Sequence, residues 1–544
     1  MLEKVQADRL AKLEQIKAMG VDPYGWRYDT SEPIASILGR YVDDKEGQVA
    51  DAAGRIVLLR DMGKMMFAHL RDESGQMQVA FRKNALDDAG WKLAGLLDLG
   101  DIVGTSGLLQ KSRTGEITIW SDKLTLLAKS LNPMPEKFHG LQDTETRYRQ
   151  RYLDLMTNPD SMATFKKRIE IIEHFRTTLK ARGFVEVETP MMQAVYGGAA
   201  ARPFVTHHNA LDCDLFLRIS PELYLKRLLV GGMERVFEIN RNFRNEGLDT
   251  RHNPEFTMME LYQAYADYEV MMEITETLVA GAAEVVVPHA DAIARKWLPV
   301  EDTVRQGEDA GTPYLGMGAV PVVVDGVRQL GLATFPVAHA RAIIDAKKGR
   351  DEGKLTLPYG GFEIDFTAPW RRVKYADLLA EHAGVAMRDM PAVRAKARQL
   401  GIEESNKDDA VVINEVFEAT VEAHLVQPTF VKDYPAELCP LTRRDPTDPS
   451  IALRFEAFVA GMEIANAYTE LNDPAVQEAN FAGQLRGEAE TMRVMDEDFV
   501  TSLRHGMPPA GGLGIGIDRV VMLLTNSQSI RDVVLFPLLR PQTR

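Results

Sequence analysis

The sequence predicts a two-domain α+β protein in which a small β-barrel precedes a larger domain of helices and antiparallel strands. Three observations lead to this fold class. Short runs of strand-forming residues, separated by Gly- or Asp-containing turns, fill residues 55–128. A proline-containing segment follows at 131–143. From residue 147 onward, helical and strand patterns mix through one long region, which is typical of an α+β domain.

The composition indicates an ordinary globular protein. The chain has 544 residues, of which 45% are hydrophobic and 26% are charged. It lacks an apolar run long enough to span a membrane and an apolar signal core at its N-terminus, so we expect a cytoplasmic protein with no membrane contact. Its two cysteines, Cys213 and Cys439, argue against a disulfide framework and a cysteine-based zinc site. The net charge of −15 excludes a generally basic nucleic-acid binder but leaves room for a local basic face.

Residues 1–50 are predicted to form an N-terminal helical segment. Its first helix is expected over 3–18, where Leu10, Leu13 and Ile16 recur at helical spacing, and Gly20 ends it.

Residues 51–130 are predicted to form a small barrel of the OB type, because about five short strands in so small a region suit that fold. The strands are expected at 56–60, 66–70, 77–81, 101–104 and 116–120. Residues 131–146 are predicted to be a linker, since Pro133 and Pro135 prevent regular strand pairing.

The larger domain, residues 147–544, is expected to begin with a helix that Gly183 caps and a strand at 184–188. The predicted apolar face of the helix consists of Ile169, Ile172, Phe175 and Leu179. Taken alone, this segment would be an ordinary helix and strand.

A long hairpin is predicted over residues 236–268, with its turn at 247–254 and its return strand at 255–262. The first strand is expected to run into Arg244 and Glu246, which would share one face. The return strand would place Phe256, Glu260 and Tyr262 together on another face. Such charged faces are poor material for a core. Because Arg binds phosphate and a ring stacks on a base, the pattern favours a nucleotide site, with a solvated hairpin as the alternative.

Acidic residues gather in the segment 454–473. Asn466, Tyr468 and Glu470 would point the same way in an extended strand, and Glu456 and Glu463 precede them. Neighbouring carboxylates repel one another unless a cation is present. Mg²⁺ and an ammonium group are the two natural partners, and an exposed acidic strand is the alternative.

A glycine-rich run at 511–516 precedes an apolar helix at 520–524. Its spacing and the absence of a preceding strand differ from a dinucleotide-binding fingerprint. We interpret it as a strand whose backbone can approach a ligand. Asp518 would begin the helix, and Arg519 in its first turn could hold a phosphate. A flexible glycine loop is the alternative.

Together these segments resemble the class II aminoacyl-tRNA synthetases. The three signature motifs of that family match residues 165–190, 243–246 with its hairpin, and 514–519, in the same order and spacing. Within the family, the bacterial lysyl-tRNA synthetases are similar at 137–143, 147–155, 197–204 and 207–212. The resemblance covers nearly the whole chain. It implies an OB-fold anticodon-binding domain, then a catalytic antiparallel sheet flanked by helices, and a homodimer with the first motif at the subunit interface.

The resemblance also implies an activity: L-lysine and ATP would form lysyl-adenylate and pyrophosphate with Mg²⁺ present, and lysine would then pass to the 3′ end of tRNA(Lys). The implied catalytic residues are Arg244, Glu246 and Arg519. The implied ATP-binding residues are Arg244, His252, Asn253, Phe256 and Arg519. The implied lysine-binding residues are Gly198, Glu222, Glu260, Tyr262, Asn466, Tyr468 and Glu470. Glu456 and Glu463 would bind Mg²⁺. The implied anticodon-binding residues are Arg60, Phe67, Gln78 and Glu116.

The chain departs from this resemblance at two places: Tyr468 stands where many members of the family would have Phe, and one long segment, residues 288–355, would be an added insertion. A short strand is expected there at 322–324 and a helix at 338–348. A tRNA-binding face on the first helix, formed by Lys4, Arg9, Lys12 and Lys17, is a further hypothesis.

Three other functions remain open at this stage. They are a sister synthetase for aspartate or asparagine, a ligase that attaches lysine to a protein, and a non-catalytic RNA-binding protein. The acidic residues disfavour the first because a carboxylate substrate would need Arg or Lys, and the barrel disfavours the second.

Overall fold

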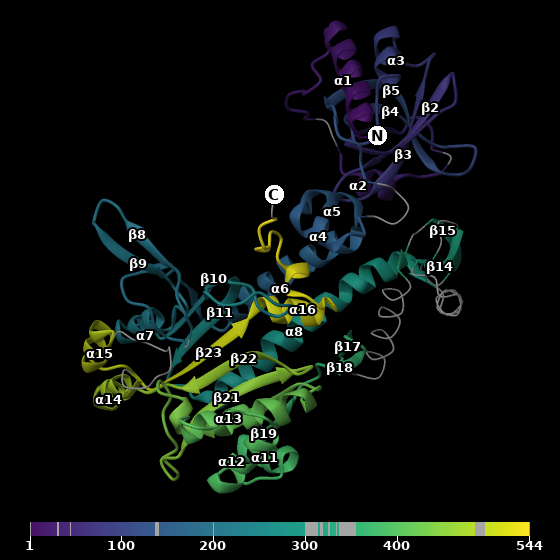
Figure 1. Cartoon of the computed structure of the whole chain (residues 1–544). Coiled ribbons are helices and arrows are strands. Elements are labelled where there is room, and N and C mark those ends of the chain that lie inside the picture. Colours follow the sequence, from purple (N-terminus) through teal and green to yellow (C-terminus); the bar gives the residue numbers. More distant parts are fainter. Residues whose placement is uncertain are drawn as a thin grey trace. The chain divides into compact units, whose positions relative to one another are not determined.

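The computed structural model describes residues 2–29, 32–43, 45–135, 141–199, 201–299, 314–315, 319–324, 327–332, 335–336, 355–484 and 495–542 (Figure 1). The chain divides into two compact units. Unit 1 contains Met1–Arg147 and Tyr152–Thr157, and unit 2 contains Tyr148–Arg151 and Asn158–Arg544. Within the described part of the chain, every helix is too short or too polar to cross a membrane. The helix expected at 338–348, positions 137–140 of one family motif and position 200 of another lie outside the described residues.

Unit 1 contains a closed barrel of five strands in the order β1-β2-β3-β5-β4, which confirms the predicted OB-type architecture. These strands are β1 (Val49–Asp61), β2 (Met65–Arg71), β3 (Gln76–Arg82), β4 (Ile102–Lys111) and β5 (Ile117–Ala128). In β2, Met66, Ala68 and Leu70 are buried inside the barrel, whereas Phe67 and His69 between them are half-buried on the outer face. The two-residue alternation of a strand therefore separates a core face from a face available to ligands.

Three helices of unit 1 pack against the barrel: α1 (Leu2–Ala18), α2 (Ile34–Arg40) and α3 (Asp88–Ala94). Ile16 of α1 joins the barrel core, but Leu10 is 46% exposed, so the expected apolar face is wrong at that residue. Arg9 is buried and donates hydrogen bonds to the carbonyl groups of Leu99 and Ser130. It therefore supports the fold of unit 1, and the hypothesis that it belongs to a tRNA-binding face is wrong.

Unit 2 is built on a sheet of eight strands in the order β19-β20-β21-β22-β23-β11-β10-β6 (Figure 1). Its strands are β6 (Val185–Glu186), β10 (Arg235–Phe243), β11 (Glu255–Ala264), β19 (Arg371–Lys374), β20 (Thr429–Pro435), β21 (Ile451–Val459), β22 (Met462–Thr469) and β23 (Ala510–Gly516). All neighbours are antiparallel except the outermost pairs at each edge, β19 with β20 and β10 with β6. The predicted antiparallel sheet with helices is confirmed.

One face of this sheet is covered by α6 (Pro159–Ala181), α8 (Tyr268–Trp297) and α16 (Ile517–Leu524). On α6 the buried stripe contains Ile171, Phe175 and Leu179, whereas Ile169 is 67% exposed. The predicted helix is present, but its face is wrong at Ile169. Successive residues turn by about 100° along a helix, so Ile169 and Ile171 point in nearly opposite directions and only one of them can face the core.

The remaining helices and strands of the described residues complete the two units. The helices are α4 (Thr144–Arg149), α5 (Arg151–Thr157), α7 (Glu222–Val230), α11 (Tyr375–Ala383), α12 (Met390–Gln399), α13 (Asp409–Thr420), α14 (Pro474–Gln484), α15 (Glu497–Arg504), α17 (Ile530–Val533), η1 (Glu422–His424) and η2 (Ala436–Leu438). The strands are β7 (Met192–Gln193), β8 (Val205–His208), β9 (Cys213–Leu217), β12 (Leu298–Pro299), β13 (Tyr314–Leu315), β14 (Ala319–Val324), β15 (Val327–Leu332), β16 (Phe335–Pro336), β17 (Thr356–Tyr359) and β18 (Phe362–Asp365). The strand expected at 322–324 lies within β14.

Candidate active site

The glycine-rich run forms β23 in the middle of the sheet, and α16 begins directly after it at Ile517. In register, Gly512 lies between Tyr262 of β11 and Tyr468 of β22. A Cβ atom on Gly512 would overlap the Glu470 carboxylate and lie 2.5 Å from Cε1 of Tyr262. Glycine is therefore required here because the neighbouring side chains lie across its backbone. The strand interpretation of this run is correct, and the flexible-loop alternative is wrong.

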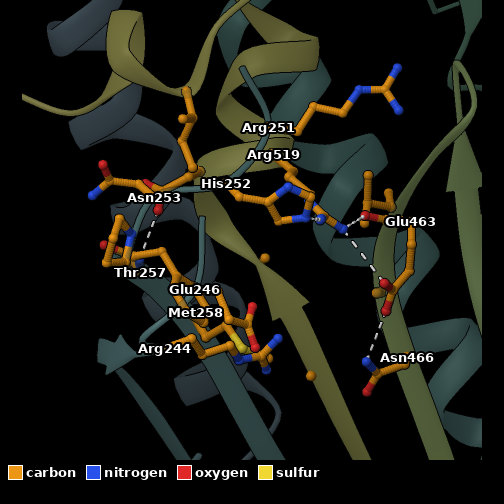
Figure 2. A pocket seen from close by; sticks show the side chains of 18 of the residues that line it. Arg244, Glu246, Arg251, His252, Asn253, Thr257, Met258, Glu463, Asn466 and Arg519 are labelled. Atoms are coloured by element: carbon orange, nitrogen blue, oxygen red, sulfur yellow. Dashed lines mark hydrogen bonds and ion pairs between the residues drawn. The ribbon is translucent and has the colours of Figure 1, made fainter. Parts of the chain in front are cut away.

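A pocket opens between β11, β22, the start of α16 and the loop that joins β10 to β11 (Figure 2). We call it the Arg244–Arg519 pocket. Arg519 donates to the carbonyl oxygen of Glu463 at 2.7 Å, and its other terminal nitrogen lies 3.0 Å from Nε2 of His252. Asn466 donates to Oε1 of Glu463 at 2.9 Å. The pocket is thus lined by a connected set of polar side chains from elements far apart in the sequence.

Arg244 and Glu246 line this pocket, but they do so from a loop. The first hairpin strand was expected to reach Glu246, and this is wrong because β10 ends at Phe243. The backbone of Arg244 turns there, donating to the carbonyl of Pro254 at 2.8 Å. The guanidinium of Arg244 lies over the ring of Phe256 with 5.0 Å to the ring centroid, while Glu246 is exposed.

Two buried polar atoms of pocket-lining residues lack a hydrogen-bond partner among the described residues. They are Nε of Arg244 and Oδ1 of Asn253, whose amide nitrogen donates to the carbonyl of Glu255 at 2.6 Å. An unsatisfied buried donor or acceptor is costly, and such groups are usually paired. A ligand that carries both acceptors and N–H groups would satisfy them.

Beside this pocket lies an acidic cluster of three buried side chains, Glu222, Glu260 and Glu470. Glu260 accepts a hydrogen bond from Ser220 at 2.9 Å and lies 3.4 Å from the Tyr262 hydroxyl. The register of β23 places Gly514 between Glu260 and Asn466, so the cluster adjoins the pocket along the glycine strand. The alternative of an exposed acidic strand is wrong.

All seven residues that the resemblance implies for lysine binding meet around this cluster. Glu260, Tyr262 and Glu470 flank the glycine strand from both sides, as do Asn466 and Tyr468. Gly198 adopts a positive φ of 86°, and a Cβ atom there would lie 3.0 Å from Cβ of Glu222.

Burial governs the electrostatics of the cluster. It raises the pKa of Glu260 to about 8 and, despite a neighbouring ammonium group, raises the pKa of Glu470 to about 8. Removal of a carboxylate from water disfavours its charged form, and the nearby Glu222 adds repulsion. The cluster therefore holds carboxylates that gain from a positively charged partner.

Glu456 and Glu463 lie on the neighbouring strands β21 and β22. Burial, partly offset by Arg454, raises the pKa of Glu456. Burial acts in the same sense on Glu463, but Arg519, the hydrogen bond from Asn466 and two further arginines together outweigh it and lower that pKa. Within the described residues, no group of three His, Cys, Asp or Glu side chains could hold a metal ion. Two adjacent carboxylates that repel each other beside a pocket still fit Mg²⁺, which takes one or two protein carboxylates and completes its shell with phosphates and water.

On the barrel, Phe67 of β2 and Gln78 of β3 lie on the outer face, and Glu116 directly precedes β5. Gln78 donates to Glu116 at 2.7 Å, and Phe67 makes an edge contact with Trp120 at 6.3 Å between centroids. Arg60 is exposed and pairs with Phe67 in the strand register. Phe67 lies on the face opposite the core residues, so its ring is not part of the barrel core.

Sequence reasoning missed several residues of these sites. His69 and Trp120 belong to the outer barrel face, and the alternation along β2 and β5 could have identified them. Ser220 and Lys226 belong to the acidic cluster. The spacing of Glu222 and Lys226 is that of a common surface ion pair on a helix, so the sequence carries no sign that this pair is buried.

Comparison with known proteins agrees with this geometry. Residues 143–540 match the family model of class II tRNA synthetases (D, K and N), and residues 51–127 match the OB-fold nucleic-acid-binding domain. The chain is 45% identical to the lysine–tRNA ligase of Pelotomaculum thermopropionicum, over 99% of this chain and 96% of that protein. It is 43% identical to the lysine–tRNA ligase of Staphylococcus aureus, over 98% of this chain and 97% of that protein. The chain therefore belongs to the class II tRNA synthetases of the D, K and N type.

Proposed function

We propose that this protein is a lysine–tRNA ligase. It condenses L-lysine with ATP to give lysyl-adenylate and pyrophosphate, and it then transfers lysine to the 3′ end of tRNA(Lys). The observation that carries the proposal is the buried acidic cluster, which adjoins the Arg244–Arg519 pocket along the glycine strand. The similarity to lysine–tRNA ligases over nearly the full length of both chains supports it.

The acidic cluster suits a substrate that carries two ammonium groups. Glu260, Tyr262 and Glu470 would hold the ε-ammonium of lysine, and Oε1 of Glu470 has no hydrogen-bond partner among the described residues. Gly198 and Glu222 would face the α-ammonium, with Asn466 and Tyr468 lining the space between. A site built from carboxylates rejects aspartate and asparagine, because its buried acidic groups would then lack a cation.

The Arg244–Arg519 pocket suits ATP. Phe256 would stack on the adenine, and His252 and Asn253 would bind near the base and ribose. Arg519 would hold the γ-phosphate, and Arg244 would bind the α-phosphate and the lysine carboxylate, with Glu246 close by at the rim. The carboxylate oxygen of lysine attacks the α-phosphorus and the bond to pyrophosphate breaks, so no protein nucleophile is needed. The protein contributes positioning and stabilisation of the charge that develops at phosphorus.

Glu456 and Glu463 would hold Mg²⁺ at the edge of the pocket. The ion would supply positive charge to the phosphates of ATP. The arrangement of Glu463 supports this role, since its side chain faces the pocket while Asn466 and Arg519 fix its position.

We propose that residues 51–130 read the anticodon and that 131–146 link them to a catalytic domain at 147–544. A splayed base would stack on Phe67 while Gln78, Glu116 and Arg60 contact its edge and backbone, the usual mode for single-stranded RNA. We further propose that the protein works in the cytoplasm.

We also propose a homodimer. The residues Ile169 of α6, Val185 of the edge strand β6 and Met192 of β7 are apolar and exposed, and all three belong to the first part of unit 2. An unpaired sheet edge and exposed apolar side chains favour burial against a second copy of the same surface.

Amino-acid-dependent exchange of pyrophosphate into ATP tests the activity, with each standard amino acid offered in turn. Lysine alone should support exchange, and tRNA(Lys) should then accept lysine. Exchange with aspartate or asparagine would contradict the assignment of the acidic cluster, and exchange with no amino acid would contradict the proposed activity.

A further inference from the structure

Lys226 is a buried cation within the acidic cluster. It lies on α7, one turn after Glu222, and its side chain is fully buried. Its ammonium nitrogen lies 2.6 Å from Oε1 of Glu222 and 2.5 Å from Oε2 of Glu470. The ring of Tyr262 lies 5.9 Å from it. Lys226 therefore joins a helix residue to a residue that follows β22.

Packing alone does not explain a lysine at this position. An ammonium group loses its hydration on burial, and replacement of a buried ion pair by apolar residues of similar volume is often neutral or stabilising. The neighbours Leu223, Leu225 and Leu229 on the same helix are buried apolar residues, so a methionine would suit the surroundings of the Lys226 stem. The charge of Lys226 is what distinguishes it.

The charges of the cluster show what Lys226 changes. Glu222, Glu260 and Glu470 provide three carboxylates, and Lys226 balances one of them. Two carboxylates then remain for the two ammonium groups of lysine. Lys226 approaches Oε2 of Glu470 as an ion pair, and Oε1 lies over Gly512 of the glycine strand; neither oxygen accepts a hydrogen bond from the described residues.

We propose that Lys226 is a positioning residue of the amino-acid site. Its ammonium bridges Glu222 and Glu470, sets the separation of their carboxylates, and directs Oε1 of Glu470 toward the substrate. The inference rests on the proposed function, because it takes lysine as the ligand of the acidic cluster. Lys226 itself does not touch the reacting atoms.

Removal of this charge should weaken lysine binding specifically. Without the bridge, Glu222 and Glu470 repel each other more strongly, and a more tightly held proton or a rotated side chain relieves the repulsion. The substrate ammonium must then displace that proton or pull the carboxylate back. ATP binds beside Arg244 and Arg519, away from this contact, so its binding should be unaffected.

The test compares Lys226→Met with Arg227→Met in the full-length protein. The control residue is next on the same helix and is also ion-paired, with Asp496 and Asp498, but it is not part of the cluster. Lysine-dependent pyrophosphate exchange gives the KM for lysine and the KM for ATP, and thermal unfolding reports folding. For Lys226→Met, we expect the KM for lysine to rise about tenfold or more, because a rise of one unit in the pKa of the cluster carboxylates makes their proton about tenfold harder for lysine to displace. The KM for ATP should stay within about twofold. The control should leave both KM values near those of the unaltered protein.

Lys226→Gln provides the second variant, since it keeps a hydrogen-bond donor and removes the charge. We expect it to raise the KM for lysine as well. An unchanged or lower KM for lysine in either variant would overturn the inference, and so would an equal rise in both KM values, because that pattern reports a general structural role. If the unaltered protein gave no lysine-dependent exchange, the proposed function would fail and this inference with it. Lysine-dependent exchange that is insensitive to Lys226 would contradict the inference alone.

Discussion

Among the alanine substitutions of the glycines in β23, Gly512→Ala should raise the KM for lysine the most. The new Cβ atom would overlap the Glu470 carboxylate and lie 2.5 Å from Cε1 of Tyr262. Both side chains belong to the acidic cluster and have little room to move, because each is buried. The methyl group must therefore displace the two residues that would hold the ε-ammonium of lysine.

The same strand provides a graded series of controls. A Cβ atom on Gly514 would lie 3.0 Å from the flexible end of Met258, and one on Gly516 would meet nothing nearer than 3.8 Å. Neither glycine has a backbone conformation that excludes alanine. Overpacking of a buried site costs about 1–3 kcal/mol, which corresponds to a rise of roughly 5- to 150-fold in the KM for lysine if the strain falls on the bound state. We expect an effect of this size for Gly512→Ala, a smaller one for Gly514→Ala, and none for Gly516→Ala.

The assay is lysine-dependent pyrophosphate exchange at saturating ATP, with thermal unfolding measured in parallel. The melting temperature separates loss of the fold from displacement of the cluster. If Gly512→Ala and Gly516→Ala gave the same KM for lysine, the argument that Glu470 and Tyr262 lie over this glycine to bind substrate would be refuted.

Three further predictions follow from the same geometry. Burial raises the pKa values of Glu260 and Glu470 to about 8, so these carboxyls hold protons in the empty site below that pH. Lysine must displace these protons when it binds. The KM for lysine should therefore fall as the pH rises from 6 to 8, by up to about tenfold per pH unit for each proton released. A flat profile over this window would contradict the raised pKa values. Glu463→Gln should increase the Mg²⁺ concentration needed for half-maximal exchange while the KM for lysine stays the same, and an unchanged Mg²⁺ requirement would argue against Glu463 as a ligand. Phe67→Ala should raise the KM for tRNA(Lys) by roughly 5- to 150-fold, the value of one base stack of about 1–3 kcal/mol, with no change in pyrophosphate exchange; an unaltered KM for tRNA would remove Phe67 from the anticodon site.

The fold could be predicted well where the sequence pattern is local. Strand alternation and turn residues located the five strands of the barrel, since both signals act between neighbouring residues. The same reasoning identified α6 but placed Ile169 on its buried face. Ile169 and Ile171 are equally apolar, and the choice between them depends on how the helix is rotated against α8, which no local pattern records.

The candidate site could be predicted in part. Its acidic residues, its arginines and its glycine strand were all identified in the sequence, and the structure brings them together from segments more than 200 residues apart. Arg244 and Glu246 were expected at the end of a strand and lie in a loop, because β10 ends at Phe243. The resemblance to a known family, together with the residue chemistry, supplied the roles that spacing alone left open.

What the sequence by itself determined is the set of chemical groups and the local elements that carry them. It also determined that β23 could pass close to its neighbours, since only glycine tolerates side chains that lie directly over its backbone. The tertiary structure alone decided which of these groups lost contact with water. Glu222 and Lys226 are one helical turn apart, and on an exposed helix they would form a weak surface ion pair. Packing of α7 against β11 instead buries both residues beside Glu470. Away from water, a charged side chain is stable only when a partner of opposite charge or a hydrogen bond compensates it.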